Sequence, residues 1–428
     1  MGWLSYVAIA VFVVVYALIA TEKIHRIAAV MGGVGIMMAL RVITVESGFH
    51  AVETGVDWNV IFLLFGMMVI VSVTKHTGVF EYVAILATKA ARGRPFAVMV
   101  MLTMVTAVAS ALLDNVTTVL LIAPVTLLVC NRLGQRPVPF LIAEAIVSNI
   151  GGTATLVGDP PNIIIGSRAG LDFNSFLIHL GPVVLVLLVA FVALAWLLWG
   201  RRLGYDAEAA AKVMALDEKE AIQNRPLLIK SLVVLGLVLT AFVFHSALHL
   251  DPAVVALLGA GVLVALSRLS ASEFLEEVEW GTLTFFMGLF MLVGSLVELG
   301  VIEALGRWLA GAVGDRVFLA GSVLLFASGI LSAVVDNIPY VATMTPIVSE
   351  LAHGPQGQPL WWALALGADL GGNATAVGAS ANVVVLGIAA RNGHPISFWE
   401  FTKYGLVVAG ATLVLAWLCW AARYFWLV

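Results

Sequence analysis

The chain has 428 residues, of which 61% are hydrophobic and only 11% are charged, and its formal net charge at pH 7 is -4. This composition leaves too little polar surface to cover a soluble globule, and the small, scattered charge argues against a nucleic-acid partner. Two distant cysteines, Cys130 and Cys419, exclude a disulfide framework. The composition therefore predicts a protein embedded in the lipid bilayer of the cell (inner) membrane.

Apolar segments long enough to cross a bilayer recur along the whole chain. A spanning helix needs about 20 mostly apolar residues. The segments that meet this requirement are 3–20, 27–45, 58–74, 138–170, 174–200, 227–248, 252–267, 280–298, 359–391 and 404–422. The first lacks the basic start and the cleavage site of a signal peptide, so we expect a retained helix. The fold class that follows is an all-α polytopic membrane protein with about ten crossings.

Between the third and fourth crossings, two apolar arms at 96–131 meet at Asp114-Asn115. They predict either a polar surface turn between two full-length helices or a re-entrant hairpin. The next segment, 138–170, favours the hairpin because its Gly-Gly-Thr-Ala-Thr and Gly-Asp-Pro-Pro-Asn sequences break the helix near its middle. Broken backbone at membrane depth is tolerated where it lines a cavity. We therefore expect a re-entrant helical hairpin followed by a broken helix.

Lys and Arg predict the orientation, because they favour cytoplasmic segments. They gather at 23–26, 75–94, 132–136 and 201–202, whereas 46–57 contains neither. This pattern predicts that the N-terminus and the C-terminus lie outside. The hydrophilic residues 201–226 then form a cytoplasmic linker.

After the linker the pattern repeats. Ser-Ala-Leu-Leu-Asp-Asn at 110–115 returns as Ser-Ala-Val-Val-Asp-Asn at 332–337. The same spacing relates Trp58 to Trp280, Gly66 to Gly288 and Pro124 to Pro346. The sequence thus predicts an N-terminal repeat at 1–200 and a C-terminal repeat at 227–428, the latter with a hairpin at 318–352 and a broken helix at 359–391. An odd number of crossings per repeat inverts the second, and such proteins place the transport site at the repeat interface.

The Asp-Asn pairs carry the first candidate functional residues. A charged Asp at mid-bilayer depth costs roughly 2.5 to 3.5 kcal/mol, so Asp114 and Asp336 at equivalent positions require an explanation. A buried carboxyl can take and release a proton. We expect Asp114, Asp336 and Asp369, the last within the second broken helix, to bind the driving protons or an exchanged cation.

Polar side chains around the tips and the breaks are the candidates for holding the cargo. They are Asn115, Thr117, Asn149, Thr153, Thr155, Asp159, Asn162, Asn337, Asn373, Thr375 and Asn382. Asp159 has a second interpretation, because it precedes Pro160 and could cap the following helix. Asn149 aligns with Asp369, and Asp159 aligns with Ala379, so we expect two chemically unlike half-sites. No cluster of metal ligands is apparent, and no cofactor is expected.

These motifs resemble a known family. Asp114-Asn-Val-Thr-Thr, then Asn149-Ile-Gly-Gly-Thr-Ala-Thr and Gly158-Asp-Pro-Pro-Asn, are similar to the arsenite permease (ArsB) and melanosomal P protein branch of the ion transporter superfamily. The resemblance covers essentially the whole chain. It implies two inverted repeats with re-entrant hairpins, tips that converge near the midplane, and alternating access. The divalent-anion/sodium symporters of the superfamily carry Ser-Asn-Thr at the tips, and the replacement by Asp-Asn here argues against sodium-coupled anion import.

Electrostatics point to an uncharged cargo. A carboxylate at each tip would repel a dianion, and neither repeat core supplies an Arg to offset that charge. Arsenite and antimonite are uncharged trihydroxides near neutral pH and suit hydroxyl, amide and carboxylate groups. The leading hypothesis is a proton-coupled efflux carrier for arsenite and antimonite.

Other functions stay open. The same aspartates would serve a Na+/H+ antiporter, with Na+ as the coupling ion, and an anion transporter or channel is a further alternative. An enzyme is not expected, because no nucleophile with a base, phosphate loop or metal triad is present. A small inorganic substrate, a soluble arsenite-driven ATPase and a second copy of the chain in a homodimer are the partners that the resemblance allows, although nothing in the sequence identifies a dimer surface.

Overall fold

The computed structural model describes residues 2–21, 24–51, 54–313, 316–352 and 357–426, and within these ranges the chain is helical and contains no strand. In the first half the helices are α1 (Trp3–Thr21), α2 (Arg26–Ala39), α3 (Trp58–Lys75), α4 (Val79–Ala90), α5 (Pro95–Leu112), α6 (Asn115–Leu133), α7 (Val138–Gly152), α8 (Pro160–Ala169) and α9 (Phe173–Leu198). In the second half they are α11 (Arg225–Leu248), α12 (Pro252–Ser267), α13 (Ala271–Leu275), α14 (Trp280–Glu298), α15 (Val301–Val313), α16 (Val317–Ser332), α17 (Asn337–Leu351), α18 (Gln358–Gly371), α19 (Ser380–Arg391) and α20 (Phe398–Ala421).

The apolar helices confirm the predicted fold class. Among the described residues, 7 helices are long and apolar enough to cross a membrane, and several shorter apolar helices accompany them. The chain is therefore an all-α polytopic membrane protein. The number of crossings and the orientation stay predictions, and Lys23, which contributes to the predicted orientation, lies outside the described residues.

Helices of the two halves interlock in equivalent pairs. α3 packs against α12, and α14 packs against α2. Gly66 of α3 lies against the Ala256 backbone, and Gly288 of α14 lies against the Val30 side chain. These contacts are related by the repeat, because aligning Gly33 and Gly35 with Gly259 and Gly261 places Val30 opposite Ala256. Each half therefore completes the packing of the other.

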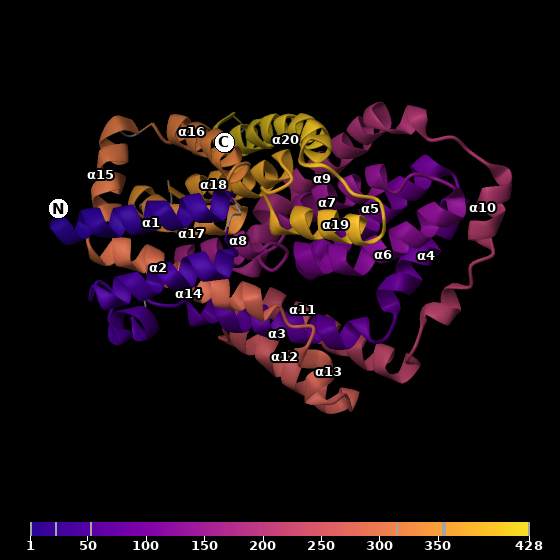
Figure 1. Ribbon diagram of the computed structural model, residues 1–428, viewed down its shortest axis with the longest axis horizontal. Helices are drawn as coiled ribbons and strands as arrows, with labels where there is room; N and C mark the ends of the chain where they lie inside the picture. The colour runs from indigo at the N-terminus through magenta and orange to yellow at the C-terminus, as the bar shows by residue number, and fades with distance from the viewer. Residues whose placement is uncertain (1, 22–23, 52–53, 314–315, 353–356, 427–428) are drawn as a thin grey trace.

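The hairpins lie toward opposite ends of the molecule (Figure 1). α4, α5 and α6 gather near one end, α15, α16 and α17 gather near the other, and the broken helices α7/α8 and α18/α19 lie between them (Figure 1). Two further pairs cross between the halves, because α8 packs against α17 and α19 packs against α6. The tips and the breaks consequently meet in the middle of the fold.

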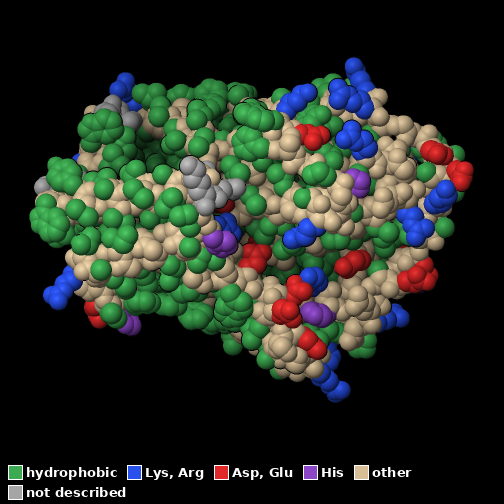
Figure 2. All heavy atoms as spheres, viewed as in Figure 1, with side chains coloured by type: hydrophobic (Ala, Val, Ile, Leu, Met, Phe, Trp, Pro, Cys, Tyr) green, Lys and Arg blue, Asp and Glu red, His purple; other side chains and the backbone are tan. Residues whose placement is uncertain are grey.

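The segment between the halves is docked rather than free. α10 (Ala207–Met214) packs against α6, and the short 3-10 helix at Glu218–Ala221 packs against α4. Lys89 of α4 donates to the Glu218 carboxylate at 2.6 Å, and the Gln223 amide donates to the Thr77 carbonyl at 3.0 Å. On the visible face, charged side chains concentrate on the half of the molecule that carries α4 and α10, whereas hydrophobic side chains dominate over α1 and α15 (Figure 2).

Candidate transport site

Each hairpin turns at an aspartate that caps the following helix. The Asp114 carboxylate accepts a hydrogen bond from the Thr117 amide at 2.7 Å, and the Asp336 carboxylate accepts one from the Ile338 amide at 3.1 Å. Both aspartates thus satisfy backbone donors that a helix start leaves unpaired. In each carboxylate one oxygen accepts the capping hydrogen bond, which leaves the second oxygen for other partners.

The breaks form where glycine lets two backbones touch. A Cβ on Gly151 would lie 2.4 Å from the Ala107 carbonyl of α5, and a Cβ on Gly371 would lie 2.4 Å from the Gly329 carbonyl of α16. Real side chains do not tolerate such distances, so each break is pressed directly against its own hairpin. Pro160 then starts α8, where a missing amide hydrogen costs nothing.

Hydroxyl and amide groups fasten each break to its hairpin in the same way. Ser110 donates to the Ser148 carbonyl and Thr155 donates to the Ala111 carbonyl; in the second half, Ser332 donates to the Ala368 carbonyl and Thr375 donates to the Ala333 carbonyl. Inside the breaks, Asn162 donates to the Thr155 carbonyl at 3.0 Å and Asn382 donates to the Thr375 carbonyl at 2.9 Å. These side chains satisfy backbone groups that the broken helices would otherwise leave unpaired.

Buried amides connect the two halves at the centre. Asn115 donates to both the Asn149 carbonyl oxygen and the Asp159 carboxylate at 2.9 Å. Asn149 in turn donates across the repeat interface to Asn373 at 2.9 Å and to Asn382 at 3.2 Å. We call the following residues the central cluster: Asn115, Asn149, Asp159, Asn337, Asp369, Asn373 and Asn382. All are buried, and they bring both hairpin tips and both breaks together.

Asp159 links the two tips instead of capping a helix. It precedes α8, but its side chain makes no capping hydrogen bond. It accepts from Asn115 of one tip and, at 3.3 Å, from Asn337 of the other. The capping interpretation of Asp159 is therefore wrong, and its carboxylate lies in the central cluster.

Several oxygen atoms at the centre have no protein donor. Within the described residues, both oxygens of Asp369 and the side-chain oxygens of Asn115 and Asn162 are buried without a hydrogen bond, although Thr153 and Asn162 lie beside the Asp369 carboxyl. The charges of Asp114, Asp336 and Asp369 all act on Asp159. Mutually repelling buried carboxylates cannot all be ionised without partners. The geometry thus favours a bound proton, cation or hydroxylated cargo.

An arginine reaches the second tip from the other half of the chain. Arg26 of α2 lies 3.4 Å from the Asp336 carboxylate, donates to the Ser380 hydroxyl at 2.8 Å and stacks over the Phe285 ring at 5.3 Å. The expectation that no Arg offsets the tip carboxylates is therefore wrong for Asp336. The sequence separates the partners by most of the chain, and the only local signal is a basic residue that opens an apolar helix.

A cavity of about 430 Å³ leads to this ion pair. Arg26, Glu279, Asp336, Ser380 and Val383 are among the residues that line it, and we call it the Arg26 cavity. It gives water access to the second tip. The equivalent tip residue, Asp114, does not line it.

Thr117 stays close to the tip without entering the cluster, because its backbone amide and its hydroxyl serve Asp114. Thr153 returns its hydroxyl to the Asn149 carbonyl at 2.8 Å. Glu144, a buried acid of α7, bonds to Thr126 of α6 and leaves its second oxygen without a partner in the described structure. Within that same part of the chain, no group of His, Cys, Asp or Glu is arranged to hold a metal ion.

Comparison with known proteins places the chain among membrane transporters. It is 53% identical over 428 residues to the 46 kDa membrane protein of Mycobacterium leprae, covering 99% of each chain. It is 54% identical to an uncharacterized transporter of Mycobacterium tuberculosis, covering 99% of this chain and 98% of that one. The human P protein is 37% identical over 96% of this chain, which matches only 59% of that longer protein. The predicted likeness to the P protein is confirmed, whereas the arsenite permease relation stays a prediction.

Two solved structures share the fold at 14% identity. They are the YdaH transporter of Alcanivorax borkumensis, with a TM-score of 0.59 and 85% of each chain covered, and MtrF of Neisseria gonorrhoeae, with a TM-score of 0.60 and 99% and 95% covered. A family model described as a citrate transporter matches residues 16–367. The chain is thus a multi-pass membrane transporter, and it belongs to the CitMHS citrate transporter family.

Proposed function

We propose that the protein is a proton-coupled secondary active transporter that works by alternating access between two inverted repeats and exports arsenite or antimonite. The observation that carries the proposal is the set of unpaired oxygens in the central cluster and beside it, namely those of Asp369 and Asn115 in the cluster and of Asn162 next to it. An uncharged trihydroxide offers three O–H donors to such acceptors. No thiol belongs to the cluster, so a metalloid bound there could be released.

The coupling group in this proposal is the carboxylate pair Asp159 and Asp369. Both are fully buried, and each carries a charge that opposes the other. Binding of a proton removes that repulsion, and binding of cargo at Asp369 competes with binding of the proton. Asp114 assists at the first tip. Asp336 has Arg26 as its partner and serves to hold the second tip.

Citrate is the second candidate cargo, because the family description names it and Arg26 supplies a guanidinium that can bind a carboxylate. Against it stands the excess of carboxylates, which a free tricarboxylate would meet at close range. The sodium/proton antiporter is favoured by the same unpaired oxygens, since oxygen ligands suit hard cations.

The test is flux in proteoliposomes with a pH gradient, in which arsenite, antimonite, sodium and citrate are offered separately. Cargo-dependent proton movement with arsenite or antimonite alone supports the proposal. Movement only with sodium or only with citrate would overturn the proposed cargo in favour of that candidate. Saturable flux distinguishes a carrier from a channel.

Variants locate the coupling group. Asp159→Asn and Asp369→Asn are expected to lower proton-coupled flux at least tenfold, whereas Asp206→Asn, in the exposed linker, should leave flux unchanged. Normal coupling in both cluster variants would contradict the assignment of Asp159 and Asp369, whatever the cargo.

A further inference from the structure

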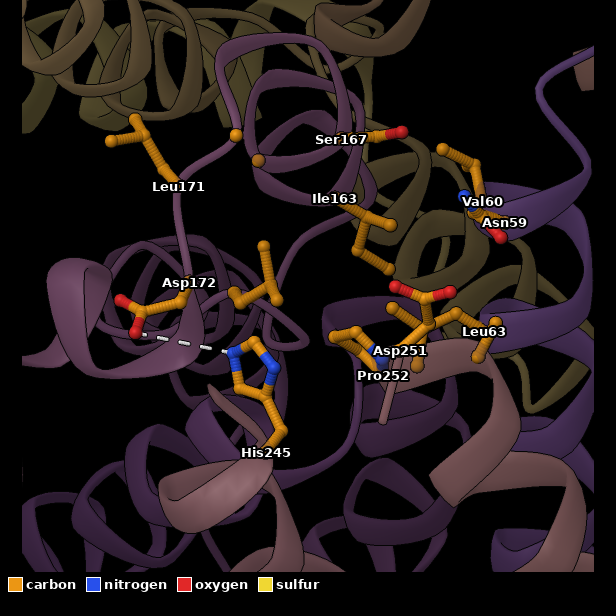
Figure 3. Close-up of a pocket in the computed structure, with 14 residues that line it drawn as sticks. Asn59, Val60, Leu63, Ile163, Ser167, Leu171, Asp172, His245, Asp251 and Pro252 are labelled. Atoms are coloured by element: carbon orange, nitrogen blue, oxygen red, sulfur yellow. Dashed lines mark ion pairs between the residues drawn. The ribbon is translucent and has the colours of Figure 1, made fainter. Parts of the chain in front are cut away.

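A second cavity, of about 260 Å³, has no residue of the central cluster in its lining (Figure 3). Leu63 of α3, Ile163 of α8, His245 near the end of α11 and Pro252 at the start of α12 are among its lining residues, and we call it the His245 cavity. Figure 3 shows the Asp172 carboxylate pointing toward the His245 ring from the turn before α9. Nothing in the transport site uses these groups.

The His245 cavity and the Arg26 cavity occupy equivalent places in the two repeats. The repeat spacing pairs Leu63 with Phe285 and Ile163 with Val383, and each residue lines its own cavity. Aligning the glycines of α2 with those of α12 pairs Ile19 with His245 and Arg26 with Pro252, which again line opposite cavities. One inherited feature is therefore present twice, once for each hairpin.

The two cavities differ in depth. The Arg26 cavity reaches the second hairpin tip at Asp336 and Ser380. The lining of the His245 cavity includes neither of their counterparts, Asp114 and Pro160. Val383, which lines the Arg26 cavity, is 43% exposed, whereas its counterpart Ile163, which lines the His245 cavity, is 3% exposed. Both cavities open at the surface, but only the Arg26 cavity extends to a hairpin tip.

Two polar contacts lie at the His245 cavity, one a hydrogen bond and the other a 4.0 Å approach of a carboxylate to an imidazole, and neither has a counterpart in the Arg26 cavity. The Ser167 hydroxyl of α8 donates to the Asp57 carboxylate at the start of α3 at 2.6 Å. The equivalent of Ser167 is Gly387, which has no side chain to donate. One contact that ties α8 to α3 is thus specific to the first repeat.

The second contact crosses from α9 to α11. One Asp172 oxygen caps α9 through Ser175, and the other lies 4.0 Å from the His245 imidazole. Asn174 reinforces this junction by donating to the Val243 carbonyl at 2.6 Å. The residue that caps the equivalent helix, α20, is Ser397, whose hydroxyl accepts from the Glu400 amide at 3.1 Å, and the equivalent of His245 is Ile19, which has no polar side chain. This contact, too, is absent from the Arg26 cavity.

We propose that the His245 cavity is the second access path to the central cluster, and that the Ser167–Asp57 and Asp172–His245 contacts are the latch that keeps it shut. The orientation predicted from Lys and Arg places the closed path outside and the open path in the cytoplasm. Its acidic lining, Asp172 and Asp251, suits cations or an uncharged cargo better than anions. The proposal rests on the transporter assignment and not on which cargo is carried.

Cysteine labelling tests the latch without any cargo. In a background with Cys130→Ala and Cys419→Ala, Val383→Cys should react with a membrane-impermeant maleimide from one side, and Ile163→Cys should react at least tenfold more slowly from either side. Adding Ser167→Ala and Asp172→Asn should raise Ile163→Cys labelling at least fivefold from the opposite side and slow Val383→Cys labelling. Asp251→Asn, which removes an acid from the same cavity without removing a contact, should change neither rate.

Equal labelling of Ile163→Cys with and without the latch contacts would overturn the proposal, as would labelling of both cysteines from one side. A second experiment avoids dependence on those variants. A short bifunctional thiol reagent across Asp172→Cys and His245→Cys should abolish the flux that the same double variant shows before treatment, whereas a monofunctional thiol reagent should not. Full flux in the cross-linked protein would exclude a moving latch.

Discussion

At the scale of single residues, the two tip aspartates look alike in sequence but differ in surroundings. Asp336 has a guanidinium partner in Arg26, whereas Asp114 lies among groups that carry no positive charge at contact distance in the described structure. The guanidinium therefore gives Asp336 a charge partner that Asp114 does not have. The unequal roles follow from one residue of α2.

Arg26→Gln is expected to lower flux about tenfold, because it leaves the largely buried Asp336 carboxylate without its charge partner. The double variant Arg26→Gln with Asp336→Asn should recover much of that loss, since no unpaired charge remains. Flux in proteoliposomes measures both, with Arg202→Gln in the exposed linker as control.

If flux in the double variant is no higher than in Arg26→Gln alone, Arg26 acts on the cargo and not on Asp336. Arg26→Lys should restore only part of the flux lost in Arg26→Gln, because an ammonium is more strongly hydrated than the guanidinium, whose Nη1 donates to both Asp336 and Ser380.

The sequence predicted which residues gather at the centre but not how they are paired. Asp-Asn pairs and glycine-rich breaks in apolar sequence leave few places to put buried amides, so Asn115, Asn149 and Asn337 were identifiable. The partners of Asp159 and Asp336 were not, because those contacts join α8 and α2 to segments far along the chain. Such long-range side-chain contacts depend on how the helices cross in space, which the local sequence pattern does not specify.

At the scale of elements, the broken helices are held by hydroxyl side chains. Thr155 and Thr375 were expected to bind cargo, yet each hydroxyl donates to a hairpin carbonyl, that of Ala111 or that of Ala333. The cargo role assigned to these two threonines stays an untested prediction. Their contacts give them a clear structural role at the breaks.

Thr155→Val and Thr375→Val should each lower the free energy of unfolding by about 1 to 3 kcal/mol, because each leaves a carbonyl at the hairpin end without its donor. The loss should be the larger at Thr155, because its hydroxyl also accepts from the Gly158 amide at 3.1 Å, whereas the Gly378 amide donates to the Thr375 main-chain carbonyl. Reversible unfolding in SDS micelles measures them. Thr240→Val, on an exposed face of α11, is the matched control and should stay within about 0.5 kcal/mol of the parent. A loss in only one of the two would show that the breaks are held differently.

The docked linker gives a pH-dependent element. The hydrogen bond from Lys89 holds the pKa of Glu218 below its ordinary value of 4.5. A lowered pKa means that the contact stabilises docking above pH 4.5 and is lost as the pH falls through the lowered value. A fluorophore on Ala215→Cys should therefore gain mobility on acidification from about pH 7 to about pH 3. With Glu218→Gln, the probe should already be mobile at neutral pH; a probe that stays immobile there would contradict this role for the Lys89–Glu218 contact.

At the scale of the whole molecule, duplication made most of the fold predictable. The paired motifs located both hairpins and both breaks, because the same Asp-Asn and glycine-rich sequences occur in each half. The interlocking of α3 with α12 and of α14 with α2 could not be predicted, since either half could have packed on itself with the same apolar faces. Close approach at glycine selects the interlocked arrangement.

Gly66 and Gly288 test that arrangement as an equivalent pair with unequal neighbours. A Cβ at Gly66 would lie 2.8 Å from the backbone carbon of Ala256, whereas one at Gly288 would lie 2.5 Å from a methyl group of Val30. Backbone cannot move without shifting α12, but a side chain can turn away. We therefore expect Gly66→Ala to destabilise the protein by about 1 to 3 kcal/mol and Gly288→Ala to cost less, as measured by unfolding in SDS micelles. Gly236→Ala, at an open position of α11, should cost nothing, and a larger loss at Gly288 than at Gly66 would mean that the two repeats do not interlock through α3 and α12 as the structure has them.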